Sequence, residues 1–282
     1  MTSFSPVLIT GCSTGIGRAT AERLATSGHT VYATARRLDA LAGLERSGCK
    51  LLALDVTDED SMGGAVDAVV AAEGGLGALV NNAGYSQSGA IETVELDAVR
   101  RQFETNVFGL IRMSQLVLPH MRAAGRGRIV NISSMGANFT FPGGGIYHAT
   151  KYAVEAISDA LRFEVKGFGV DVVIIQPGAI RTEFGAAANA SLEAHAGGGP
   201  YDAFNASIGR ITEEAYDSGA LKLLGGGPET VAKAIETALT AEKPKLRYRV
   251  TPSATVLTGQ RRLLGARGWD RFIATRFPRP GT

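Results

Sequence analysis

The fold of this chain is decided by the stretch Thr10-Gly11-Cys12-Ser13-Thr14-Gly15-Ile16-Gly17. This stretch follows the short apolar run Val7–Thr10 and leads into a helical pattern over residues 16–27, which ends at Gly28. A glycine-rich turn between a strand and a helix lets backbone N–H groups approach a phosphate, and the helix N-terminus adds a partial positive charge. A tight turn without a ligand is the alternative, and the position directly after a strand favours the phosphate-binding loop.

Outward from this loop, short apolar runs alternate with helical patterns along most of the chain. The apolar runs predict strands at Val7–Thr10, Val31–Thr34, Leu51–Leu54, Ala78–Val80, Arg128–Ile132 and Val170–Ile175. The segments between and after them predict helices over residues 16–27, 38–46, 59–73, 95–122, 147–166 and 228–241. Such alternation forms a parallel sheet whose right-handed crossovers place helices on both faces. We therefore predict an α/β protein with a doubly wound, Rossmann-type parallel sheet in one domain of residues 1–282.

Two later segments depart from this alternation. Residues 185–227 are rich in Ala, Gly, Asn and Ser, and an insertion of this length is typical of a substrate lid or a mobile loop. Residues 243–282 hold ten basic residues and one acidic residue, Asp270, whereas residues 1–242 hold 19 basic and 26 acidic residues. The total net charge of +2 therefore conceals an acidic body of −7 and a basic C-terminal extension of +9.

This charge division limits the partners of the chain. An acidic body argues against nucleic-acid binding, which requires a basic surface. The extension mixes its arginines with apolar residues and predicts a short amphipathic helix; these residues are Leu263, Leu264, Trp269, Phe272 and Ile273. We favour docking of this helix on the acidic body or on a neighbouring subunit, and contact with an anionic membrane surface is the alternative.

Other classes of protein are excluded by composition. Cys12 and Cys49 are too few for a disulfide framework and predict free thiols in a reducing compartment. No basic segment precedes the apolar run at Val7–Thr10, and no apolar run reaches about 18 residues, so neither a signal peptide nor a transmembrane helix is expected. Four scattered histidines give no metal-ligand spacing, so we expect no metal. These features predict a cytoplasmic protein.

Further motifs follow the predicted strands in order. Asn81-Asn82-Ala83-Gly84 follows the fourth strand, Tyr147 and Lys151 form a Y-x-x-x-K pair, and Pro177-Gly178 closes the sixth strand. Together with the G-x-x-x-G-x-G spacing of residues 11–17, these motifs resemble the classical short-chain dehydrogenase/reductase (SDR) family over residues 5–185. The stretch Val31–Arg37 and the C-terminal extension resemble, more weakly, members that act on steroids or retinoids.

The resemblance implies a catalytic group of Asn106, Ser134, Tyr147 and Lys151. Tyr147 and Lys151 share one helix face, and an ammonium beside a phenol stabilises the phenolate, which suits Tyr147 as a general acid/base. Ser134, which has Ser133 as a rival, lies 13 residues before Tyr147 at the family's spacing and would donate to a carbonyl oxygen. Asn106 is implied to orient the helix backbone and a water that relays protons to Lys151. The alternatives are a surface Tyr/Lys pair, a turn serine and a buried structural amide.

The resemblance also implies a nicotinamide cofactor held by residues near the strand ends. These residues are Gly11, Ser13, Thr14, Gly15, Ile16, Gly17, Arg36, Asp55, Val56, Asn82, Ala83, Gly84, Tyr147, Lys151, Pro177, Gly178, Ile180 and Thr182. NAD-specific members carry an acidic residue at the end of the second strand, where this chain has Ala35 followed by Arg36 and Arg37. A guanidinium binds a 2′-phosphate through two parallel hydrogen bonds. We therefore predict NADP(H) rather than NAD(H), with Arg36 as the phosphate-binding group and Arg37 as a solvated charge.

The substrate region is predicted at residues 135–145 and 184–227. Apolar side chains there favour a hydrophobic alcohol or ketone, although they could equally pack the lid onto the body; they are Met135, Phe139, Phe141, Phe184, Leu192, Tyr201 and Phe204. The predicted reaction is hydride transfer between the nicotinamide and a carbonyl or secondary-alcohol carbon. A ketoacyl-type reductase of the same family and a non-catalytic NADP(H)-binding regulator are the alternatives. The resemblance further implies a homodimer or homotetramer formed through residues 95–122 and 147–166.

Overall fold

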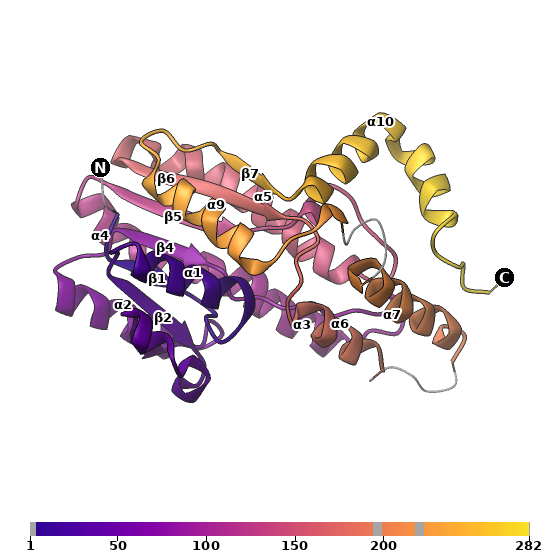
Figure 1. Cartoon of the computed structure of the whole chain (residues 1–282), viewed down its shortest axis with the longest axis horizontal. Coiled ribbons are helices and arrows are strands. Elements are labelled where there is room, and N and C mark those ends of the chain that lie inside the picture. Colours follow the sequence, from indigo (N-terminus) through magenta and orange to yellow (C-terminus); the bar gives the residue numbers. More distant parts are fainter. Residues whose placement is uncertain (1–3, 194–198, 218–222, 282) are drawn as a thin grey trace.

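A computed structural model of the chain describes residues 4–193, 199–217 and 223–281. At its centre lies a parallel sheet of seven described strands in the order β3-β2-β1-β4-β5-β6-β7 (Figure 1). The strands are β1 (Val7–Ile9), β2 (Val31–Ala35), β3 (Lys50–Ala53), β4 (Ala78–Asn81), β5 (Gly127–Ile132), β6 (Val170–Pro177) and β7 (Arg247–Val250). Every neighbouring pair runs parallel, which confirms the predicted α/β class.

Helices cover both faces of the sheet, as the alternating pattern predicts. They are α1 (Gly15–Thr26), α2 (Glu59–Glu73), α3 (Leu96–Phe103), α4 (Gly109–Ala123), α5 (Gly145–Val165), α6 (Phe184–Glu193), α7 (Asp202–Asp217), α9 (Pro228–Thr240) and α10 (Pro252–Ala274). Successive side chains of a strand point to opposite faces. In β1, Val7 and Ile9 therefore join the core beneath α1 and α9, whereas Leu8 joins the core beneath α2 and α4.

The strand order determines where a ligand can bind. Val7 of β1 is paired with Val31 of β2 on one side and with Ala78 of β4 on the other. The chain thus adds β2 and β3 on one side of β1, and then adds β4 to β7 on the other side. In open α/β sheets a crevice forms beyond the carboxyl ends of the strands at this reversal, and ligands bind there.

One predicted helix is absent. Residues 38–46 form two short 3₁₀ turns, Leu38–Leu41 and Leu44–Ser47, instead of the single helix that the sequence predicts. Gly43 lies between them with φ of 93°, a left-handed conformation that ends the first turn. The Arg18 guanidinium of α1 donates to the Ala42 carbonyl at 2.9 Å and holds this connection against α1.

The two segments after β6 contain more regular structure than the sequence predicts. The described part of residues 185–227 is largely helical, and α6 packs against α7 around Leu192, Phe204 and Ile208. The basic extension contributes the edge strand β7, which the sequence prediction missed because arginines occupy two of its four positions. Arg247 of β7 donates to Glu155 of α5 at 2.8 Å, so a charged residue is accommodated at this edge.

The helix α10 is bent at Gly265, where φ is 61° and ψ is −169°. It therefore consists of two arms, residues 252–264 and residues 266–274, joined by an elbow that projects from the rest of the molecule (Figure 1). Trp269 of the second arm packs against Phe139 and Phe141, with ring centroids 5.1 and 6.0 Å apart. Within the described ranges, no helix combines the length and the apolar character needed to cross a bilayer.

A buried arginine joins the sheet to α9. Arg128 of β5 is 1% exposed, and its Nη2 donates to Asp171 of β6 at 2.8 Å. Its Nη1 donates to three main-chain carbonyls at the end of α9, at 2.8, 3.0 and 2.7 Å, those of Ala238, Leu239 and Ala241. The helix C-terminus leaves such carbonyls without intrahelical partners, and a cation there also interacts favourably with the helix dipole.

We expect Arg128→Met to destabilise the protein, because the main-chain carbonyls at the end of α9 then remain buried without their donor. Leaving a buried hydrogen-bonding group without a partner costs about 1–3 kcal/mol in free energy of unfolding. Urea denaturation followed by circular dichroism measures this loss. Arg100, whose exposed pair with Asp97 spans 2.7 Å, provides the control: Arg100→Met should cost less than about 1 kcal/mol. Equal losses in the two variants would contradict the role assigned to Arg128.

Candidate active site

A cavity of about 1400 Å³ lies at the carboxyl ends of the strands, at the position expected from the strand order. One half is lined by the loops that follow β1 to β4, including Gly11, Arg36, Asp55 and Asn82. The other half is lined by the segment after β5, by α7 and by α10, including Phe139, Ile208 and Phe272. The cavity thus joins a glycine-lined half to an apolar half.

The loop after β1 is held tightly by the loop after β4. The side-chain amide of Asn82 donates to the Gly11 carbonyl at 2.9 Å. A Cβ on Gly11 would lie 2.9 Å from the Cα of Ala83, and a Cβ on Gly17 would lie 2.2 Å from the Gly11 carbonyl oxygen. Gly11 and Gly17 are therefore required by close backbone approach, whereas Gly15, with φ of 57°, turns the chain beside the cavity.

The end of β2 presents two arginines with different surroundings. Arg37 forms an exposed ion pair with Asp39 at 3.4 Å, which agrees with its predicted role as a surface charge. Arg36 lines the cavity, and no carboxylate in the described part of the chain forms an ion pair with it. The Arg36 guanidinium can therefore bind an anionic ligand without first breaking an internal pair.

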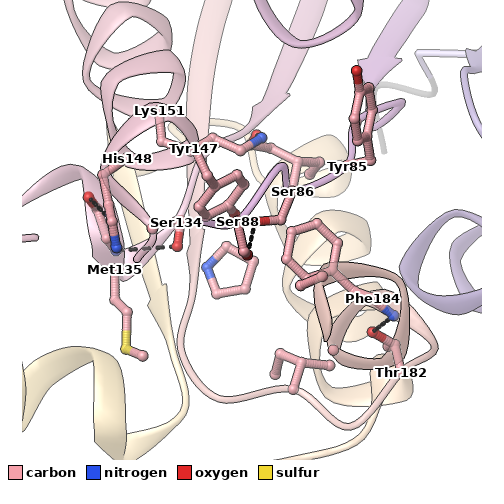
Figure 2. A pocket seen from close by; sticks show the side chains of 18 of the residues that line it. Tyr85, Ser86, Ser88, Ser134, Met135, Tyr147, His148, Lys151, Thr182 and Phe184 are labelled. Atoms are coloured by element: carbon pink, nitrogen blue, oxygen red, sulfur yellow. Dashed lines mark hydrogen bonds between the residues drawn. The ribbon is translucent and has the colours of Figure 1, made fainter. Parts of the chain in front are cut away.

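Ser134 and Tyr147 meet at the boundary between the two halves of the cavity (Figure 2). The ring of Tyr147, in the first turn of α5, lies 5.3 Å from the ring of Phe184. The Ser134 Oγ accepts from the Gly136 N–H at 3.0 Å, and no acceptor among the described residues takes the hydroxyl proton. Ser134 can thus donate that proton to a ligand, whereas the rival Ser133 is 2% exposed.

Lys151 lies one helical turn beyond Tyr147. Its Nζ donates to the Ile132 carbonyl at 2.8 Å and lies 5.7 Å from the centroid of the Tyr147 ring. Burial lowers the pKa of Lys151 to about 8, although the nearby Glu155 carboxylate opposes this change. The ammonium form still predominates at neutral pH, so a positive charge faces the Tyr147 ring under those conditions.

Asn106 lies behind the cavity in a π-helical turn, Glu104–Phe108, between α3 and α4. Its side chain accepts from the Tyr85 N–H at 3.1 Å and donates to the Tyr85 carbonyl at 2.9 Å and to the Thr150 Oγ1 at 3.1 Å. Asn106 therefore ties the loop after β4 to the helix that carries Lys151. The water relay implied for Asn106 stays a prediction.

The other predicted cofactor residues, Gly17 excepted, all border the cavity. They are Ser13, Thr14, Ile16, Asp55, Val56, Ala83, Gly84, Pro177, Gly178, Ile180 and Thr182. A groove that runs from an unpaired cation at Arg36, past a glycine turn at a helix N-terminus, to Tyr147 fits an elongated dinucleotide. The residues present thus fit a nicotinamide dinucleotide, and their individual contacts with it stay predictions.

The apolar half contains only some of the residues predicted to line it. Met135, Phe139, Phe141 and Phe184 border the cavity. The three others are in the cluster that joins α6 and α7, where Leu192 and Phe204 are buried and Tyr201 packs against them. The basic extension, which the sequence placed outside the site, contributes further lining residues: Val256, Leu257, Gln260, Phe272, Arg276 and Phe277.

Sequence analysis missed His148, which organises the loop between Ser134 and α5. Its Nδ1 lies 2.7 Å from the Gly136 carbonyl oxygen, and its Nε2 accepts from the Phe141 N–H at 3.3 Å. The neutral ring with the proton on Nδ1 makes both bonds. Gly136 in turn donates to the Ser134 Oγ, so one buried imidazole fixes the loop that holds this serine. A histidine inside Y-x-x-x-K was the available signal.

The Rossmann-type sheet, the glycine loop and the Ser134–Tyr147–Lys151 cluster define the class of a nicotinamide-dependent oxidoreductase. The sequence profile of the family described as "short chain dehydrogenase" matches residues 5–193. The chain belongs to the short-chain dehydrogenase/reductase family.

Named relatives cover most of the chain. It is 37% identical over 251 residues to a 3-ketodihydrosphingosine reductase of Bacteroides thetaiotaomicron, with 89% of each chain covered. It is 34% identical over 276 residues to an NADPH-dependent 3-dehydrocapnine reductase of Ornithobacterium rhinotracheale, covering 94% of this chain and 95% of the relative. A short-chain dehydrogenase from Streptomyces avermitilis has a similar structure, with a TM-score of 0.76, 34% identity and coverage of 96% and 98%. A serine dehydrogenase in complex with NADP⁺ matches with a TM-score of 0.75, 26% identity and coverage of 87% and 94%.

We expect the contribution of His148 to stability to depend on pH. Burial lowers the pKa of His148, so the unfolded chain takes up a proton near pH ~6.5 that the folded chain resists. The contribution should be complete above this pH and decline as the pH falls toward the lower folded-state pKa. The free energy of unfolding of the parent protein should fall between about pH 7.5 and 5. In His148→Gln this fall should be smaller by on the order of 1 kcal/mol.

Urea denaturation at several pH values gives this difference, and His120→Gln on α4 is a matched histidine control. An unchanged pH dependence in His148→Gln would show that this imidazole does not titrate on unfolding.

Proposed function

We propose that the chain is an NADP(H)-dependent oxidoreductase that transfers hydride between the nicotinamide and the carbonyl or secondary-alcohol carbon of a hydrophobic substrate. The observation that carries this proposal is the convergence of Ser134, Tyr147 and Lys151 where the glycine-lined half of the cavity meets the apolar half. The proposal treats residues 1–282 as one domain, with residues 185–227 as a substrate lid.

Each polar group has a separate part in the proposed reaction. The bound nicotinamide supplies the hydride in reduction and accepts it in oxidation. Ser134 donates its hydroxyl proton to the substrate oxygen and stabilises the negative charge that develops there. Tyr147 protonates that oxygen in reduction and deprotonates the alcohol in oxidation. The Lys151 ammonium favours the phenolate form of Tyr147 through its positive charge.

The preference for NADP(H) rests on Arg36 and on the absence of an acidic residue at Ala35. Two relatives support it, because one is named as NADPH-dependent and another is described in complex with NADP⁺. Asp55 follows β3, the neighbour of β2, and accepts from the Thr57 N–H and Oγ1 at 2.9 and 2.7 Å. Its carboxylate is therefore engaged within its own loop.

Arg36→Ala should weaken NADPH binding about tenfold or more and leave NADH binding nearly unchanged, because hydrogen bonds to a charged group contribute ~1.5–3 kcal/mol. Titration by NADPH fluorescence measures both affinities. Arg37→Ala is the matched control and should bind both nucleotides like the parent protein. The proposal fails if the parent protein binds NADH as tightly as NADPH.

A bulky apolar ketone is the substrate class that the cavity favours. Aromatic side chains from two distant segments form its apolar half, with Phe139 and Phe141 after β5 and Phe272 and Phe277 at the end of the chain. The relative from Bacteroides thetaiotaomicron is named as a reductase of 3-ketodihydrosphingosine, which by its name is a ketone. The resemblance to members that act on steroids or retinoids and the ketoacyl alternative remain open for testing.

A panel containing 3-ketodihydrosphingosine, a steroid ketone, retinaldehyde and a carrier-linked 3-ketoacyl thioester discriminates these substrates by loss of NADPH absorbance. Tyr147→Phe should lower kcat by about a hundredfold or more on whichever compound reacts, because general acid–base catalysis contributes about 10²–10⁴-fold. NADPH affinity should change little in this variant. Equal turnover by Tyr147→Phe would reject Tyr147 as the acid/base. No turnover of these carbonyl compounds with NADPH, nor of the corresponding alcohols with NADP⁺, would favour the non-catalytic regulator.

We also propose assembly into a homodimer or homotetramer through α3, α4 and α5. Exposed aromatic side chains on this surface support it, namely Phe108 (52%), Tyr152 (44%) and Phe163 (88%). Burying such side chains between subunits would remove apolar surface from water. Light scattering gives the mass in solution, and a monomer would reject the proposal.

A further inference from the structure

The elbow of α10, defined as Arg262–Arg267, is the most exposed apolar feature of the basic extension. All six residues are exposed, and Leu263 at 89% is among the most exposed large apolar side chains described. The neighbouring Leu264 is 40% exposed. Gly265 makes the reversal because its backbone conformation belongs almost only to glycine. The elbow is therefore an ordered convex tip that carries two leucines into solvent.

The residues beside these leucines are cationic. Arg262 and Arg267 flank the tip, and Arg271 follows on the second arm. Within the part of the chain that the structure describes, no carboxylate forms an ion pair with any of these three guanidinium groups. Asp270 is the one acidic residue in the whole extension. The basic charge of the elbow is thus not neutralised by ion pairs with the described part of the acidic body.

The contacts of the two arms explain why the elbow projects. Ser253, Ala254 and Leu257 of the first arm are buried against the body, and Trp269 of the second arm is 4% exposed against the segment after β5. Both arms therefore contact the body, and the turn between them lies at the outer edge of the molecule (Figure 1). The apolar tip cannot reach the body without releasing one of these arms.

We propose that the elbow docks on the surface of an anionic lipid bilayer, with Leu263 and Leu264 inserted at the level of the headgroups. Arginines beside an inserted apolar side chain bind lipid phosphates, and each basic residue adds attraction to an anionic surface. The charge complementarity between the arginines of the elbow and an anionic bilayer favours such a bilayer as the binding partner.

A second protein fits the elbow less well than a bilayer does. A stable protein–protein interface buries about 800 Å² on each partner and about 20–30 residues a side, with matching shapes. The elbow offers six residues on a convex tip. A bilayer needs no preformed complementary surface, because lipids rearrange around an inserted side chain.

Docking through the elbow would also bring the cavity close to the bilayer. Val256 and Gln260 of the first arm and Phe272 of the second arm line the apolar half of the cavity. The elbow that joins the two arms therefore lies beside this half. An apolar substrate that partitions into lipid would then be concentrated next to the site; this consequence rests on the proposed function, whereas the docking itself does not.

Sedimentation of the full chain with sucrose-loaded vesicles tests the proposal without any enzymatic assay. We expect binding to vesicles containing about one-third phosphatidylglycerol, little binding to phosphatidylcholine alone, and release at high salt. Leu263→Ser with Leu264→Ser should lower the partition coefficient about tenfold or more. Arg262→Ala with Arg267→Ala should lower it about 30-fold, because each arginine near the surface contributes ~1 kcal/mol.

Ile91→Ser provides the matched control, because Ile91 is 69% exposed and lies outside both the extension and the proposed subunit surface of α3, α4 and α5. This variant should bind vesicles like the parent protein. Trp269 is the chain's one tryptophan, so unchanged emission in each variant shows that the second arm stays packed. Light scattering without vesicles shows whether the leucines hold subunits together.

Three results would overturn the proposal. The first is a parent protein that stays in the supernatant with anionic vesicles. The second is an elbow leucine variant that binds vesicles as well as Ile91→Ser. The third is an elbow leucine variant with a smaller mass in solution and unchanged vesicle binding, which would make the tip a subunit contact.

Discussion

The loops after β1 and β4 approach each other so closely that neither Gly11 nor Gly17 can carry a Cβ. Gly11 and Gly17 meet the required distances because they lack a Cβ, and the Asn82 amide fixes the spacing by donating to the Gly11 carbonyl. This contact places the start of α1 beside the end of β4. The glycine-lined groove depends on this contact, and the same loop after β4 brings Gly84 next to Lys151, because a Cβ on Gly84 would lie 3.7 Å from the Lys151 Nζ.

The fold and the polar centre of the candidate site were predictable because their signals are local. Strand-forming runs, helical periodicity and glycine turns act over a few residues, and alternating strands and helices with right-handed crossovers imply a parallel sheet covered on both faces. Tyr147 and Lys151 are one helical turn apart, so their shared face follows from spacing alone. Most of the predicted cofactor residues border one cavity for the same reason, because each follows a strand end.

The remaining features depend on contacts between distant segments, which spacing does not encode. His148 acquires its role only when Gly136 and Phe141 fold around it. The strand β7 is stabilised by pairing with β6 and by the contact between Arg247 and Glu155. Its own arginine-rich sequence resembles a surface loop, so the sequence alone does not predict a strand there. The separation of Leu192 from the cavity likewise depends on how α6 packs against α7.

The apolar half of the cavity is built partly by the last elements of the chain. The arms of α10 reach it from β7 at the edge of the sheet, and their aromatic side chains meet Phe139 and Phe141. The binding surface and the chemical groups thus belong to separable pieces of sequence. Exchange of this terminal segment between relatives is accordingly a route by which evolution, or an engineer, can alter ligand preference while the nucleotide half stays intact.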